Sequence, residues 1–156
     1  MSVPAAIALF LVGLIGMEFV AWWTHKYVMH GPLWVLHRSH HEPRRGAFEA
    51  NDLFAVFFAL PSIALIALGT WVWPPALWLG LGMTAYGALY ALFHDGLAHR
   101  RFPLPFPRKW LRRQVQAHRL HHAVTERDGA VSYGFLWAPS ARALKAQMQT
   151  VRSPRR

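Results

Sequence analysis

The chain of 156 residues contains no cysteine. Disulfide bonds and thiolate-bound iron are therefore excluded. The sequence also has no Glu-x-x-His motif, which helical bundles use to build carboxylate-bridged di-iron sites. Acidic residues are scarce, with seven aspartates and glutamates in the whole chain. Histidine, the commonest metal ligand in proteins, occurs ten times.

Positive charge is missing from residues 1–25 and 46–99, although the net charge is +10. A basic chain can bind nucleic acid, but here the charges form blocks that alternate with apolar runs. This arrangement is typical of the positive-inside rule of membrane proteins. We therefore expect anionic lipid headgroups as partners and no nucleic acid. The basic blocks are Lys26–Arg45, Arg100–Arg119 and Arg127–Arg156.

Three runs are almost free of charged residues, and Glu18 is their one exception. About 20 helical residues cross the hydrocarbon core of a bilayer, so each run is long enough to span it. None shows the polar face at 3.6-residue spacing that a soluble helix would need. No basic segment precedes the first run and no small-residue cleavage site follows it, so we expect a retained helix. The runs are Val3–Trp23, Leu53–Trp73 and Ala76–Phe93.

The fold predicted from these features is an all-α membrane protein, a single membrane-embedded domain over residues 1–156. About three transmembrane helices, at residues 3–23, 53–73 and 76–93, are expected together with short cytosolic or interfacial helices that carry a histidine-rich di-metal site. Three spans place all basic blocks, including residues 94–156, on the cytoplasmic side of the cell membrane.

Two further segments lie in the expected cytosolic region. Val131–Trp137 is apolar but too short to span, and we expect it to dip into the interface over the site. The basic tail after Ala141 is expected to lie on the lipid surface or to be disordered.

The histidines form two copies of one pattern, HX4H followed by HX2HH. Residues three and four apart share a helix face, so we expect the three imidazoles of each triplet to point at one spot. Imidazole suits iron, zinc, copper and nickel, and isolated structural histidines would not repeat one spacing. Two ions with about five ligands each would keep one open position per ion in octahedral geometry, which is a catalytic arrangement. The predicted metal ligands are His25, His30, His37, His40, His41, His94, His99, His118, His121 and His122.

The looser pairs are five residues apart, which is about 140° around an ideal helix. His25 and His30 can reach one metal pair only if the helical turn loosens or the two ions lie on different sides. Two spans separate His41 from His94, so all four histidine clusters return to the same side of the membrane.

Two acidic residues are candidate catalytic residues that would act beside the metal ligands. Glu18 lies two turns before His25, and a buried acid in a span is a functional candidate. Its expected role is to accept a histidine N–H, and the alternative is a polar pairing that helps helices pack. Asp95 is adjacent to His94. The pair Asn51-Asp52 resembles an N-cap, and a metal-related role for it stays open.

The tandem histidine pattern between membrane hairpins resembles the fatty-acid hydroxylase superfamily of membrane di-iron oxygenases, and within it the bacterial β-carotene 3-hydroxylase family. The resemblance covers roughly Gly16 to Pro139. The strings that carry it are Gly16-Met17-Glu18, His25 to Gly31, Ser39 to Arg44, Gly46 to Glu49 with Asn51-Asp52, Met83 to Gly87, His94 to Leu97 and Ala117 to Ala123.

The resemblance implies an oxygenase that adds a hydroxyl at C3 of β-ionone rings. The products would be β-cryptoxanthin and zeaxanthin from β-carotene, or astaxanthin from canthaxanthin. It also implies two non-haem iron ions, O2 as co-substrate and electrons from reduced ferredoxin, delivered with its reductase. All ten histidines occupy the metal-ligand positions of that family.

A basic surface could dock an acidic ferredoxin, or its charges could serve as topology signals only. Two other functions stay open. One is a related membrane hydroxylase or desaturase acting on a sterol or fatty acyl chain. The other is a bis-histidine haem protein or metal transporter, which would leave the triplets unexplained. The basic residues are Arg100, Arg101, Arg108, Lys109, Arg112 and Arg113.

Overall fold

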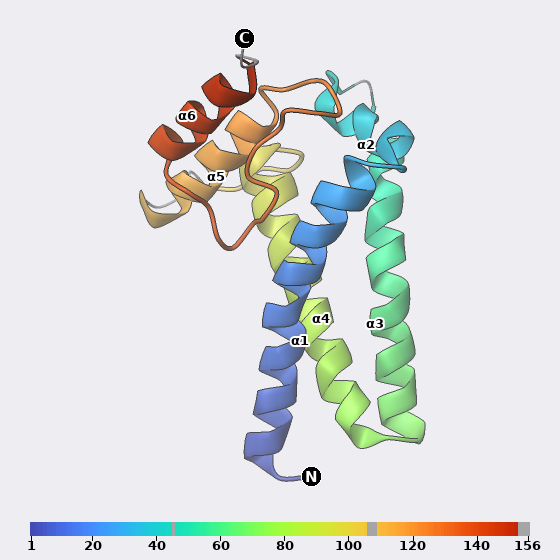
Figure 1. Cartoon of the computed structure of the whole chain (residues 1–156). Coiled ribbons are helices and arrows are strands. Elements are labelled where there is room, and N and C mark those ends of the chain that lie inside the picture. The colour runs from blue at the N-terminus through green and yellow to red at the C-terminus, as the bar shows by residue number, and fades with distance from the viewer. Residues whose placement is uncertain (45, 106–108, 153–156) are drawn as a thin grey trace.

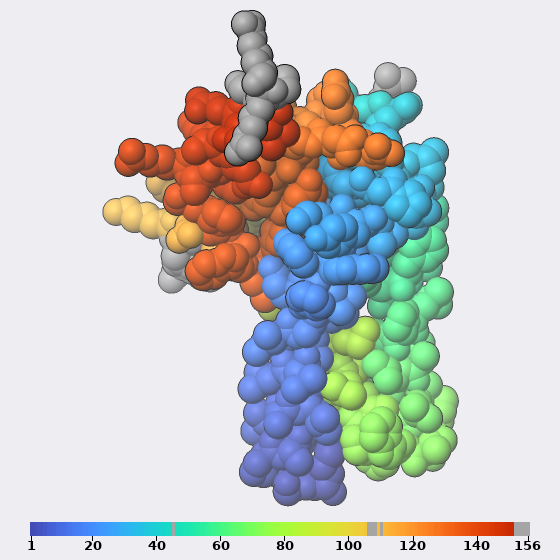
Figure 2. Space-filling view, in the orientation of Figure 1, coloured from blue at the N-terminus to red at the C-terminus, as the bar shows by residue number. Residues whose placement is uncertain are grey.

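The computed structural model describes residues 1–44, 46–105 and 109–152, and every regular element in this part of the chain is a helix (Figure 1). Three long helices form a stalk with α4 in contact with both α1 and α3. The shorter helices gather in a head at the end of the stalk remote from the N-terminus, and Figure 2 shows that this head is wider than the stalk. The stalk helices are α1 (Val3–Thr24), α3 (Leu53–Trp71) and α4 (Pro74–Tyr90), and the head contains α2 (Trp34–His41), α5 (Lys109–His121) and α6 (Ala141–Arg152).

Three helical segments are long and apolar enough to cross a membrane, as the sequence predicted. They expose large apolar side chains such as Ile15, Phe19 and Ile63. Such an apolar exterior suits a lipid environment, in which the helical backbone satisfies its own hydrogen bonds. The first and third segments run past the expected ends because each helix continues through a turn that carries histidine. The segments are Val3–Met29, Ala50–Trp71 and Pro74–Ala98.

Glycine allows the stalk helices to approach closely. A Cβ atom on Gly82 of α4 would overlap the α1 backbone, and one on Gly80 would meet Ile66 and the carbonyl oxygen of Ser62 in α3. Next to this contact, the Ser62 hydroxyl donates to the Gly80 carbonyl at 2.9 Å. In a membrane the lipid tails are as apolar as the side chains, so the hydrophobic effect does not drive helices together. Close packing at small residues and hydrogen bonds from hydroxyl groups drive helix association in its place.

The two HX4H pairs lie on π-helical turns, η1 (His25–Met29) and η3 (Ala91–Ala98), which extend α1 and α4. The His30 N–H donates to the His25 carbonyl at 3.0 Å, and the His99 N–H donates to the His94 carbonyl at 2.9 Å. A π-helical turn spans five residues, so the two histidines of each pair face the same side. The helical turn is therefore wider than in an α-helix, as predicted from the five-residue spacing, and both rings of each pair lie on the same side of the helix.

The tail folds against the head. Helix α6 packs on α5, and Leu144, which is 1% exposed, belongs to a small core with Val131 and Met148. Leu144 and Met148 are four residues apart and therefore share a helix face. The expectation of disorder is wrong for residues 141–152. Arg45, Arg108 and residues 153–156 of the predicted basic blocks lie outside the described residues.

Candidate metal centre

The histidines gather at the junction of stalk and head in two groups of five. Within each group, one ring nitrogen from every histidine lies within 4.8 Å of the others. Eight of the ten histidines are buried, and the remaining two are half-buried. The first group is His25, His30, His37, His41 and His121, and the second group is His40, His94, His99, His118 and His122.

The middle histidine of each triplet crosses over to the other group. His37 and His41 are separated by about 40° around the helix axis, whereas His40 is turned by about 100° from His41. His40 therefore joins the second group, and His121 joins the first group by the same geometry. The expectation that a whole triplet points at one spot is wrong. Each group needs residues from both halves of the chain.

The spacing between ring nitrogens fits bound metal ions. In the first group, the Nε2 atoms of His25 and His37 are 3.1 Å apart, and in the second group those of His40 and His94 are 3.0 Å apart. Two nitrogens about 2.1 Å from one ion and at right angles to each other are separated by roughly 3 Å. The donor sets can therefore hold two ions, one in each group.

Burial favours the neutral form of His37, His41 and His99. It lowers the pKa of His37 to about 3 and that of His41 to about 4, with neighbouring histidines adding to the shift. In the second group, burial and the nearby His94 lower the pKa of His99 to about 3. A metal ligand must carry a free lone pair, so neutral rings are the form that binds metal at neutral pH.

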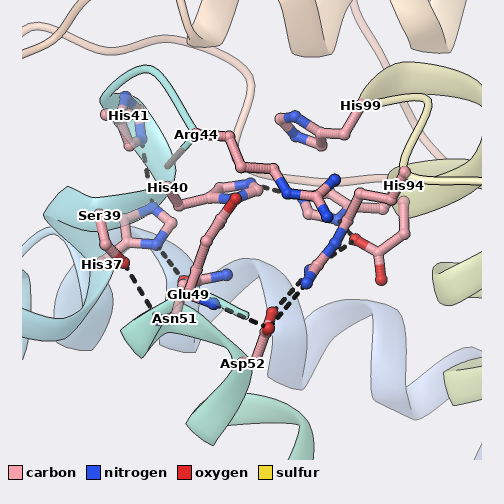
Figure 3. Close-up of polar contacts among 12 residues, drawn as sticks. His37, Ser39, His40, His41, Arg44, Glu49, Asn51, Asp52, His94 and His99 are labelled. Atoms are coloured by element: carbon pink, nitrogen blue, oxygen red, sulfur yellow. Dashed lines mark hydrogen bonds and ion pairs between the residues drawn. The ribbon is translucent and has the colours of Figure 1, made fainter. Parts of the chain in front are cut away.

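The first group is held by neutral oxygen atoms. Four of its five Nδ1–H groups donate to backbone carbonyls of residues 124–137, a segment that we call the strap. The fifth, on His37, donates to the Asn51 side-chain oxygen at 2.7 Å (Figure 3). These bonds fix the tautomer so that each Nε2 lone pair faces the centre of the group. The strap bonds join His25 to Tyr133 (3.0 Å), His30 to Arg127 (2.7 Å), His41 to Val124 (2.8 Å) and His121 to Val131 (2.9 Å).

The second group is held in part by carboxylates. The Nδ1–H of His40 donates to Glu49 at 2.9 Å, and that of His94 donates to Asp95 at 2.8 Å. Asp95 therefore contacts a predicted ligand, and its role in catalysis stays a prediction. Glu49 was missed, because an acid nine residues after His40 in a polar loop has no helical register that indicates a contact.

The loop that carries Glu49 is fixed by an arginine. The Glu49 N–H donates to the Asp52 carboxylate at 3.0 Å, as in a helix N-cap. Arg101 donates to both Asp52 oxygens, at 2.6 and 2.7 Å, and to the Ala47 carbonyl at 2.9 Å. Arg101 therefore forms an ion pair with Asp52 and stabilises the loop from which Glu49 contacts His40 of the second group.

Glu18 has partners other than those expected. One carboxylate oxygen accepts from the Tyr86 hydroxyl of α4 at 2.7 Å. The other accepts from the backbone N–H groups of Phe135 and Leu136 in the strap, at 2.7 and 2.8 Å. The prediction of a histidine N–H as the direct partner of Glu18 is wrong. The hydrogen bond to Tyr86 is a polar contact between α1 and α4.

A cavity of about 490 Å³ lies between the stalk helices below the histidines. His25 of the first group and His94 of the second both line it, so a bound molecule can contact both groups at once. The remaining wall is mainly apolar, and Phe135 of the strap contributes to it. An apolar cavity with a few convergent polar groups is typical of a small-molecule site.

Known proteins share most of this chain. The model of the fatty acid hydroxylase family matches residues 10–140. The beta-carotene hydroxylase of Pantoea ananas is 56% identical over 141 residues, covering 88% of this chain and 80% of the relative. That of Paracoccus sp. (strain PC1) is 48% identical over 136 residues, with 85% and 84% covered. The chloroplastic beta-carotene 3-hydroxylase 2 of Arabidopsis thaliana is 44% identical over 138 residues, with 85% and 45% covered.

No solved structure matches this chain significantly. The family match covers most of the chain and includes every residue of both histidine groups. The chain therefore belongs to the fatty acid hydroxylase family.

Proposed function

We propose that this protein is a carotenoid hydroxylase that adds a hydroxyl group at C3 of β-ionone rings. It would convert β-carotene to β-cryptoxanthin and then to zeaxanthin, and canthaxanthin toward astaxanthin. The observation that carries the proposal is the apolar cavity lined by one histidine of each group. The activity named for relatives up to 56% identical supports this substrate class.

The proposed cofactor is a pair of iron ions, one in each histidine group. Bound ferrous iron would supply the activation of O2 that an unactivated ring C–H bond requires and that side chains lack. One oxygen atom enters the C3–H bond as hydroxyl and the other leaves as water, while reduced ferredoxin supplies two electrons and solvent two protons. The ten histidines are the proposed ligands.

The protein's own contribution is placement of the ring. Phe54, Phe58 and Met83 line the cavity, and such apolar walls fit a hydrocarbon ring and exclude water. A ring seated against His25 and His94 would hold C3 beside both ions, which makes the reaction intramolecular. The remaining polyene would extend along the stalk into lipid, so one ring reacts at a time.

The proposed location is the cell membrane, crossed three times by one domain over residues 1–156, with the metal centre on the cytoplasmic side. Ferredoxin would then reach the basic surface of the head directly. Lys109, Arg112 and Arg113 of α5 are exposed there. Arg101 does not belong to this docking surface, because it binds Asp52.

Pigment analysis of cells that accumulate β-carotene tests the proposed reaction. Expression of this chain should convert β-carotene to β-cryptoxanthin and zeaxanthin, and cells with an empty vector provide the control. The proposal fails if β-carotene is unchanged while the protein is present in the membrane with two bound ions. If hydroxylated sterols or fatty acids form in place of hydroxylated carotenoids, the substrate is a sterol or a fatty acyl chain.

Reporter fusions after Arg45, Pro75 and Arg156 test the topology. We expect cytoplasmic signals at the first and third positions and an outside signal at Pro75, because Lys and Arg are absent around that turn. Opposite signals at Arg45 and Arg156 would contradict the shared metal centre, since the histidine triplets would then lie on different sides.

A further inference from the structure

The strap lies between α5 and α6 (Figure 1, the orange loop between these helices). It carries no regular secondary structure of its own. Its backbone carbonyls nevertheless hold four of the five histidines in the first group. A loop that orients ligands must itself be fixed, because an irregular segment otherwise samples many conformations. What fixes the strap therefore decides how well the first group is ordered.

Glu18 fastens the end of the strap to the membrane stalk. One oxygen of its carboxylate accepts from three successive N–H groups, those of Phe135 at 2.7 Å, Leu136 at 2.8 Å and, at the longer distance of 3.4 Å, Trp137. Successive backbone N–H groups that converge on one oxygen form a concave anion site. Gly134 leaves room for this contact, because a Cβ atom there would lie 3.1 Å from the same oxygen.

The contact closes a ring that includes a predicted metal ligand. Glu18 and His25 lie seven residues apart on one continuous helical segment. His25 donates to the carbonyl of Tyr133, and two residues further along the strap Phe135 donates back to Glu18. Two hydrogen bonds and two short stretches of chain therefore fix the His25 ring relative to the strap. Val131, two residues before Tyr133, holds His121 in the same way.

The strap also forms part of the cavity wall. The Phe135 ring lies 5.4 Å from the ring of Tyr90 and 5.6 Å from that of Phe93, measured between centroids. Both Phe135 and Tyr133 line the cavity next to His25. Fixing the strap thus fixes the wall of the proposed substrate site and the first group together.

We propose that Glu18 is a positioning residue for the first metal site: its carboxylate holds the strap, and the strap carbonyls hold His25 and His121 for metal binding. The strap carbonyls hold histidines of the first group, whereas Glu49 and Asp95, which lie outside the strap, orient His40 and His94 of the second. The inference rests on the proposed metal centre and assigns Glu18 to one of the two sites.

The competing explanation is that Glu18 only joins α1 to α4 through Tyr86. Tyr86→Phe is the matched control, since it removes that hydrogen bond and leaves the three strap contacts in place. Glu18→Gln is the conservative variant, because its amide oxygen can still accept from the strap N–H groups. Glu18→Ala removes every contact.

The test measures Co(II) binding, by its visible d–d absorption, in two backgrounds of the full-length protein in detergent. His94→Ala with His118→Ala leaves the first group, and His30→Ala with His37→Ala leaves the second. Glu18→Ala should weaken Co(II) binding by the first group about 10- to 100-fold and alter its spectrum. Binding by the second group should be unchanged. Glu18→Gln should restore most of the affinity, and Tyr86→Phe should have little effect.

Three results would overturn the inference: unchanged affinity of the first group in Glu18→Ala, equal losses in both groups, or a loss in Tyr86→Phe as large as in Glu18→Ala. The last two would assign Glu18 to helix packing. Failure of the unmodified chain to bind Co(II) at all would instead overturn the proposed metal centre. The two failures are therefore distinguishable.

Discussion

The two histidine groups contain the same number of imidazoles but differ in what holds them. The first group donates to backbone carbonyls and to the amide of Asn51, all of which are neutral. In the second group, Glu49 and Asp95 are the acceptors for two of the five rings, and both are carboxylates. A carboxylate acceptor makes the imidazole a stronger donor to the metal. A repeated sequence pattern has thus produced two sites with unequal electrostatics, and the second site should bind a cation more tightly.

Removing a crossed-over ligand should have the largest effect. His40→Ala and His121→Ala should each abolish hydroxylation and lower the metal content from two ions to about one, because each variant removes one of the five ligands of one group. Membrane abundance should be kept. His40→Ala should weaken metal binding by the second group, and His121→Ala should weaken binding by the first. Co(II) titration in the two backgrounds that each keep one group distinguishes the two effects. Near-normal zeaxanthin yield from either variant would remove that residue from the metal centre.

Exchanging the neutral and charged partners should have an intermediate effect. Glu49→Gln and Asp95→Asn each remove one negative charge beside the second group and should lower its Co(II) affinity about 10- to 100-fold. Asn51→Asp adds a charge beside His37 and should raise the affinity of the first group. Competition titrations with a metal indicator measure both changes. If Asn51→Asp weakens the first group, the difference between the sites does not arise from charge.

Loosening the loop that carries Glu49 should have the smallest effect. Arg101→Ala removes a two-point ion pair with Asp52, whose side chains are 14% and 26% exposed. Loss of a charged hydrogen-bonded pair of this kind costs about 1–3 kcal/mol, which corresponds to a fall in Tm of roughly 2–12 °C. Co(II) affinity of the second group should fall by a few-fold, with the first group as internal control. An equal change in both groups would show that Arg101 stabilises the head in general.

The helices and the ligand set could be predicted because they leave strong periodic signals. Apolar runs of sufficient length gave the three spans, and the repeated histidine spacing picked out every residue that the structure brings into the two groups. The crossing of His40 and His121 follows from helix angles alone, once two centres are considered in place of one. The π-helical turns were recognisable as a requirement of the five-residue spacing between His25 and His30.

The partners of the histidines were harder to predict for a physical reason. Most acceptors in the first group are backbone carbonyls of the strap, and every residue type carries one. Glu18 stands out in the sequence as an acid in a span, but most of its partners are backbone N–H groups more than a hundred residues away. Such contacts depend on the tertiary path of a loop, which local patterns do not encode.

The exchange of His40 and His121 has a consequence for how the protein matures. A chain synthesised only as far as residue 105 contains four ligands of the first group and three of the second. Neither site is complete until α5 has emerged and folded back, since it supplies His118 and His121. A truncated or half-folded polypeptide would therefore hold its ions with incomplete coordination. Full loading with metal would therefore indicate that both halves of the polypeptide have docked, and an unfinished chain could not form a complete metal centre.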